Sequence, residues 1–81
     1  MAWYKDSAHL RRTSSDHDWW TKTYDVGEVA PVSGIYRCPG CGKEIAHNQD
    51  TKLPPQNHHQ HSQNQGKVRW KLIVRSNTQG T

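Results

Sequence analysis

The sequence contains no phenylalanine, and apolar residues make up only 31% of its 81 positions. A chain of this length has room for one domain. Small chains bury a modest share of their surface, and those with a weak core usually depend on disulfides, a metal ion or oligomerisation. Apolar burial at ~25 cal/mol per Å² cannot by itself offset the entropy that so polar a chain loses on folding. The composition therefore predicts that something besides a hydrophobic core stabilises this fold.

Long apolar runs are also absent. No segment approaches the length of about 20 residues that a membrane-spanning helix needs, and the first residues lack the apolar stretch of a signal peptide. We therefore expect a cytoplasmic protein with no membrane segment. The chain has only two cysteines. They could form one disulfide, but a reducing compartment and the nearby histidines favour metal binding.

The net charge of +4 is unevenly distributed along the chain. Residues 1–30 have a net charge of −1, whereas residues 31–81 have a net charge of +5. A basic module can contact nucleic acid or an acidic protein, although many basic surfaces are simply solvated. The charge therefore permits such a partner without requiring one.

We expect three parts: a mostly irregular N-terminal segment over residues 1–26, a metal-stabilised domain over residues 27–75, and a frayed tail over residues 76–81. In the first part, residues 9–12 and 18–21 can each form a brief helical turn, but neither has an apolar stripe. Aromatic side chains of this part either fold back over the domain or form a docking surface. These aromatic residues are Trp3, Tyr4, Trp19 and Trp20.

Short strands are predicted over residues 34–38, 43–46 and 51–53, followed by a longer one over residues 67–75. Pro39-Gly40 is expected to lie in the turn between the first two, and Asn48-Gln49-Asp50 to form the next turn. Gly42 follows the second cysteine, where a positive φ is often needed.

The last strand has the clearest alternation. Its apolar positions are Val68, Trp70, Leu72 and Val74, and they alternate with Lys67, Arg69, Lys71, Ile73 and Arg75. One face is therefore apolar and the other mostly cationic. We expect the apolar face to pack with Ile35 or Tyr36. The cations Lys67, Arg69, Lys71 and Arg75 are a candidate surface for a protein or nucleic-acid partner, and equally a means of keeping an edge strand soluble.

The strongest motif pairs two cysteines with a cluster of histidines. Pro39-Gly40 separates Cys38 from Cys41, and the cluster His58-His59-Gln60-His61 begins after sixteen further residues. Two thiolates from one tight turn and two imidazoles from another form the donor set that tetrahedral Zn²⁺ takes. In small zinc fingers the metal contributes roughly 10–16 kcal/mol, which is also folding free energy. We therefore predict one structural zinc ion.

The cysteine ligands are Cys38 and Cys41, whereas the imidazole ligands are open. His58 and His61 repeat the cysteine spacing and are preferred, and His59 is the substitute ligand. Three other histidines are weaker candidates, expected to face solvent or to lie in the irregular segment: His47, His9 and His17.

Two other roles compete with a structural zinc site. The Cys38–Cys41 pair resembles a dithiol oxidoreductase motif, but such motifs start a helix in a βαβ unit, for which this chain has no room. A catalytic zinc keeps one position open for water and has a general base nearby. Four protein ligands leave no such position, and Glu44 and Asp50 are ordinary residues for a strand end and a turn. We therefore expect no catalytic residues and no enzyme activity.

A pattern of the form G-x-Y-x-C-x-x-C-G is completed by Gly34, Tyr36, Cys38, Cys41 and Gly42. Together with Leu53-Pro54-Pro55 and with Trp70 on the last strand, it resembles the small bacterial zinc-ribbon proteins, which carry a rubredoxin-like knuckle of this kind. The resemblance covers residues 27–75. It implies a small metal-stabilised all-β fold of the zinc-ribbon or rubredoxin-like type, with Cys38 and Cys41 as ligands.

The second knuckle departs from that family. Where such ribbons have cysteines after the proline pair, this chain has Gln56 and His59, so a pair from the histidine cluster has to complete the site. Ribbons of this kind bind nucleic acid, RNA polymerase or other proteins. The leading hypothesis is therefore a structural zinc-binding module that acts as a non-enzymatic adaptor. The alternative is a thiol redox or zinc-release sensor acting through Cys38 and Cys41. We expect a monomer.

Overall fold

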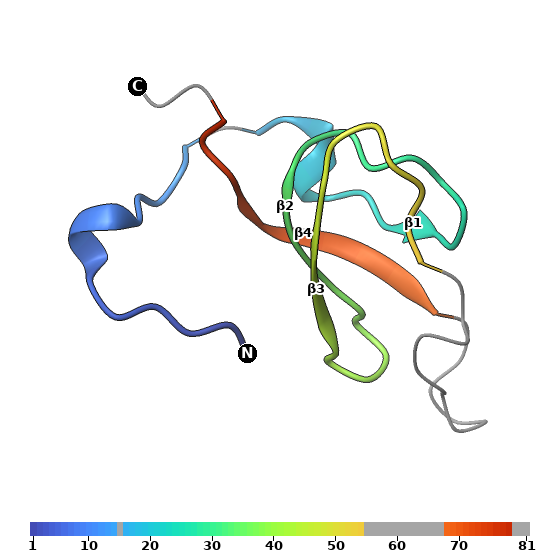
Figure 1. Cartoon of the computed structure of the whole chain (residues 1–81), viewed down its shortest axis with the longest axis horizontal. Helices are drawn as coiled ribbons and strands as arrows, with labels where there is room; N and C mark the ends of the chain where they lie inside the picture. Colours follow the sequence, from blue (N-terminus) through green and yellow to red (C-terminus); the bar gives the residue numbers. More distant parts are fainter. Residues whose placement is uncertain (15, 55–67, 79–81) are drawn as a thin grey trace.

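The computed structural model describes residues 1–14, 16–54 and 68–78. Within this part, the chain forms one antiparallel sheet of four strands in the order β1-β4-β2-β3 (Figure 1). Two single turns of 3-10 helix precede the sheet. The elements are η1 Ser7–His9, η2 Asp18–Trp20, β1 Tyr24–Asp25, β2 Gly34–Arg37, β3 Glu44–His47 and β4 Arg69–Arg75. The prediction of a small all-β fold is therefore confirmed.

β2 and β3 form a hairpin, as the sequence predicted. Gly34 lies opposite His47 and Arg37 lies opposite Glu44, so the two cysteines fall in the connecting turn. The predicted turn after β3 is also present, and Asp50 adopts a positive φ of 65° there. An aspartate tolerates this conformation better than most residues.

Residues 51–53 pair with the chain that precedes β2. Lys52 forms an isolated antiparallel bridge with Val29, and the amide of Leu53 donates to the carbonyl of Glu28 at 2.8 Å. This pairing holds residues 52–53, just before Pro54, against residues 28–29, which precede β2.

A bulge in β4 changes the alternation that the sequence predicted. Leu72 lies opposite Tyr36, but Val74 lies opposite Ile35, so the register shifts by one residue between these pairs. Directly paired residues share a face, and neighbouring residues of one strand do not, except at a bulge. Val74 therefore lies with Ile35 on the outer face of the sheet, and the prediction that it joins Leu72 on the buried face is wrong. Arg75 moves to the face that the core occupies.

The core lies on one side of the sheet. Tyr36 is its central residue on β2, and Trp70 and Leu72 project to the same side from β4. The cluster also includes residues from outside the strands. Its buried members are Tyr24, Ala30, Val32, Tyr36, Cys38, Leu53, Val68, Trp70 and Leu72.

The N-terminal segment contributes more to the sheet than the sequence indicated. β1 pairs with the start of β4 and buries Tyr24, although this stretch was expected to be mostly irregular. Trp19 and Trp20 pack against the core cluster, so these two aromatics fold back over the domain. Trp3 and Tyr4 are exposed. Of the two expected helical turns, η2 is present and η1 begins two residues earlier than expected.

No helix in the described part of the chain is both long and apolar enough to cross a membrane.

Candidate metal centre

The cysteine turn between β2 and β3 is closed by two backbone hydrogen bonds. The amide of Cys38 donates to the carbonyl of Lys43 at 2.8 Å, and the amide of Gly42 donates to the carbonyl of Cys38 at 2.8 Å. Gly42 has φ = +80°, so glycine is needed at this position, as expected. Cys38 and Cys41 therefore project from one compact turn, which is how two thiolates reach the same ion.

The two thiols have different environments. Cys38 is fully buried in the core cluster, whereas Cys41 is half-buried at its edge. Neither cysteine forms a disulfide. The pair lies in a turn between two strands, without the helix that follows a dithiol oxidoreductase motif. This context fits a metal ligand pair better than a dedicated redox catalyst.

The proposed histidine ligands, His58, His59 and His61, lie outside the described residues, but the chain on either side of them is well placed. Pro54 precedes that segment, and its carbonyl accepts a hydrogen bond from the Trp70 indole at 3.5 Å. Val68 follows it and belongs to the same buried cluster as Cys38. The described chain thus breaks off at Pro54 next to Trp70 and resumes at Val68 in the cluster that contains Cys38.

The strand register supports the same placement. Arg37 at the end of β2 lies opposite Lys71 near the start of β4. The end of β2 that leads into Cys38 is therefore adjacent to the point where the chain re-enters the sheet at Val68.

The remaining histidines lie elsewhere and have other contacts. Nε2 of His47 donates to the carbonyl of Lys52 at 2.8 Å, so this nitrogen is already engaged. His17 precedes η2 and stacks on the Trp19 ring with a centroid distance of 3.5 Å. His9 lies at the end of η1. Among residues 1–14, 16–54 and 68–78, no three histidine, cysteine or carboxylate side chains gather as a metal site.

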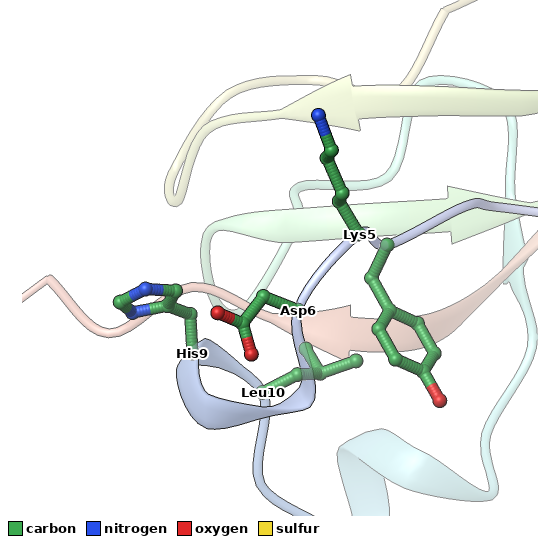
Figure 2. A pocket seen from close by; sticks show the side chains of 5 residues that line it. Lys5, Asp6, His9 and Leu10 are labelled. Atoms are coloured by element: carbon green, nitrogen blue, oxygen red, sulfur yellow. The ribbon is translucent and has the colours of Figure 1, made fainter.

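A shallow concavity surrounds η1 (Figure 2) and is lined by Tyr4, Lys5, Asp6, His9 and Leu10. A carboxylate oxygen of Asp6 accepts a hydrogen bond from the amide of Ala8 at 2.9 Å, which caps the turn. All of the lining residues are exposed. The concavity thus results from the bend of the chain at η1. Its Asp6 carboxylate caps that turn.

Two carboxylates of the domain, Glu44 and Asp50, lie at a strand end and in a turn. Glu44 forms an ion pair with Arg37 at 3.1 Å and a second one with the α-amino group of Met1 at 3.3 Å. Asp50 occupies the exposed turn after β3.

The cationic residues of β4 do not form one continuous face. Arg69 lies opposite Asp25 and pairs with it at 3.5 Å. The Arg75 guanidinium lies over the Trp19 ring, 4.8 Å from its centroid. Lys71 is exposed on the outer face with Arg69, and Lys67 lies outside the described residues. Sequence alternation could not reveal this division, because it depends on the bulge.

Protein L of Escherichia coli is 55% identical to this chain over 71 residues, which make up 88% of the chain and 80% of that relative. The chain belongs to the Protein L family. No protein-family model matches it, and no solved structure does. The name Protein L specifies neither a ligand nor an activity, so the function of this Protein L relative has to be argued from its own residues.

Proposed function

We propose that this chain is a structural zinc-binding module of the zinc-ribbon type. Cys38 and Cys41 supply two thiolates, and His58 and His61 supply two imidazoles, with His59 as the substitute. The observation that carries the proposal is the glycine-closed cysteine turn, whose Cys38 belongs to the same buried cluster as Val68, where the described chain resumes after the histidines.

The chemistry of the turn fits a zinc ion. A thiolate buried as deeply as Cys38 is costly unless a positive charge accompanies it, and a zinc ion supplies that charge. Backbone amides in such turns commonly hydrogen-bond the sulfurs and orient them. Zinc also matches the mixed thiolate and imidazole donor set better than Mg²⁺ or Ca²⁺, which prefer oxygen ligands.

The same arrangement supports a non-enzymatic role. Two thiolates and two imidazoles fill a tetrahedron and leave no position for a reacting water. Glu44 is held in its ion pair with Arg37 and is only 16% exposed. The protein therefore acts as a binding module, in which the metal fixes a small sheet that a macromolecular partner recognises.

The decisive experiment measures zinc in the purified chain and records NMR spectra with and without a chelator. We expect one zinc per chain, and loss of dispersed amide signals when the metal is removed. Histidine ring-nitrogen shifts identify the bound imidazoles. Cys41→Ser and His61→Ala should lose zinc, whereas His9→Ala is the matched control, because His9 lies on η1 away from the cysteines. A metal-free chain that folds cooperatively would refute the proposal.

A zinc-release sensor is the second candidate, and the partial exposure of Cys41 favours it. Peroxide would oxidise both thiolates to a disulfide, with peroxide reduced to water and zinc released. Mild peroxide should then release zinc in step with thiol loss, and a thiol reductant should restore binding. Cysteines that keep their zinc and stay unreactive under these conditions would exclude this role.

A further inference from the structure

The outer face of the sheet, opposite the core, carries an apolar cavity of about 510 Å³. Its floor is formed by Ile35 of β2 with Ile73 and Val74 of β4. The bulge in β4 is what brings Val74 to this face, since regular alternation would bury it with Leu72. The sheet thus has a second apolar surface that the core does not use.

Exposed aromatic side chains border this cavity. The N-terminal segment crosses the outer face, and Trp3 and Tyr4 line the cavity together with Leu10. Trp3 is 95% exposed and Tyr4 is 67% exposed. A tryptophan so fully in contact with water is costly and is typical of a surface that binds something flat and apolar.

Cations lie next to the cavity on the same face. Lys71 is directly opposite Arg37, which also lines the cavity. Like charges at directly opposed positions destabilise a sheet. Arg37 is balanced by Glu44, but no carboxylate of the described residues lies within ion-pair distance of Lys71. Repulsion between Lys71 and Arg37 therefore destabilises the sheet locally. An anion that bridges the two cations would relieve this repulsion.

Arg69 extends the same row of cations toward β1. Its ion pair with Asp25 joins two side chains that are each more than half exposed, at 3.5 Å. Surface pairs of this kind are weak, so Arg69 can exchange its partner for another anion.

We propose that this outer face, formed by Ile35, Ile73 and Val74 with Trp3, Arg37 and Lys71, binds single-stranded nucleic acid. Bases stack on Trp3 and enter the apolar cavity, while phosphates contact Lys71 and Arg37. Stacking aromatics combined with a row of cations is the general means by which proteins bind single strands without reading sequence. A duplex has its bases already stacked and cannot offer them to Trp3. The inference rests on the binding role proposed above, and it does not depend on which side chains hold the metal.

The test uses the full chain and a fluorescein-labelled oligouridylate of about 20 nucleotides, a length that exceeds the usual site of one small domain. Anisotropy titrations should show binding that weakens steeply between about 50 mM and 200 mM salt, because phosphate contacts release counterions. Trp3→Ala should weaken binding by about 5- to 150-fold, which is the range for loss of one stacked base. Lys71→Glu should weaken binding and reduce the salt slope by about one or more.

A matched control separates this face from net charge. Lys52→Glu changes the net charge by the same amount as Lys71→Glu, but Lys52 lies outside the sheet strands, where it bridges to Val29. It should therefore retain most of the affinity. Equal losses for the two variants would overturn the proposal in favour of diffuse attraction. Polyglutamate that competes as well as the oligonucleotide would overturn it in favour of an acidic protein partner, and preferred binding to a duplex would also overturn it.

Zinc content is measured in the same samples. One zinc per chain without oligonucleotide binding refutes the nucleic-acid site and leaves the metal proposal intact. Oligonucleotide binding through Trp3 and Lys71 by a folded, metal-free chain refutes the metal proposal and leaves this one intact.

Discussion

Tyr36 is the residue that joins the sheet to the loop before it. Its side chain is fully buried, and its hydroxyl donates to the carbonyl of Val32 at 2.6 Å. Its ring meets that of Tyr24 edge to face at a centroid distance of 6.3 Å. Burial raises the pKa of Tyr36 above its ordinary value of 10.0. The folded protein thus holds this proton more tightly than the unfolded chain does.

This pKa direction predicts a loss of stability at alkaline pH. The contribution of Tyr36 is fully present below pH 10.0 and is lost as the pH rises through the higher folded-state pKa. Tyr36→Phe should cost about 1 kcal/mol at neutral pH, because the Val32 carbonyl loses its donor. It should also make the alkaline decline shallower. Denaturant unfolding at several pH values checks both effects, with the exposed Tyr4→Phe as control. An unchanged alkaline decline would contradict the assignment.

Gly42 is required by the backbone of the cysteine turn. Its φ of +80° is unfavourable for any residue with a Cβ, and a Cβ there would lie 3.0 Å from the Arg37 guanidinium. Gly42→Ala should therefore destabilise the fold by about 1–2 kcal/mol and weaken zinc binding. Gly27→Ala is the control, because Gly27 has φ = +84° but nothing lies within 4 Å of the position that a Cβ would take there. Denaturant unfolding and competition with a zinc indicator measure the two effects. Equal zinc affinity in both variants would show that the turn is not part of the site.

At the scale of single elements, β2, β3 and β4 were predictable, whereas β1 was not. Which side chains of β4 face the core was predictable only in part. The hairpin and its turn follow from short β-prone runs around Pro39-Gly40, and both lie where expected. β4 was also expected, because of its alternating pattern. The bulge was not expected, because the register shift arises from the pairing of β4 with β2 and cannot be read from the alternation of residue types.

The candidate site was predictable in the same partial way. Residue type and spacing indicated Cys38 and Cys41, and the structure brings them into one turn. The histidine ligands stay a prediction, because His58, His59 and His61 lie outside the described residues. The outer apolar face could not be predicted, because it requires Val74 to turn away from the core and the N-terminal segment to cross the sheet.

Trp19 connects the η2 turn to β4. This side chain is partly buried against the core, with His17 stacked on it and the Arg75 guanidinium over its ring. The Trp19 indole Nε1 is buried without a hydrogen-bond partner in the described structure. An unsatisfied donor of this kind costs free energy, so packing and the cation–π contact have to compensate for it.

Arg75→Ala should therefore loosen η2. We expect a loss of about 0.5–1 kcal/mol from the cation–π contact, and a red shift in tryptophan fluorescence as Trp19 gains water. Arg12→Ala is the control for charge, because Arg12 lies exposed in the N-terminal segment. Fluorescence spectra and denaturant unfolding measure the two effects. Spectra that coincide for both variants would show that Arg75 does not hold Trp19.

At the scale of the whole molecule, one small sheet has a core face and an outer face with different surroundings. The core face buries Tyr36, Trp70 and Leu72 and ends at Cys38, so the apolar cluster and the cysteine turn are continuous. The outer face keeps Ile35, Ile73 and Val74 accessible beside the N-terminal segment. A core this small is marginal by itself, and a metal bound at its edge would stabilise every strand that contacts it.

With the proposed zinc bound at the cysteine turn, that continuity would couple the stability of the entire sheet to the concentration of free zinc. A ligand that binds only the folded chain stabilises it by RT ln(1 + [L]/Kd), which amounts to about 1.4 kcal/mol for each tenfold rise in free zinc above Kd. Thermal unfolding in zinc buffers should therefore shift to higher temperature with each step, and the shift should be the same by far-UV circular dichroism and by tryptophan fluorescence. Cys41→Ser should abolish the dependence, whereas His9→Ala should keep it. A melting temperature that changes with neither zinc nor chelator would show that the apolar cluster is sufficient to stabilise the fold without a metal.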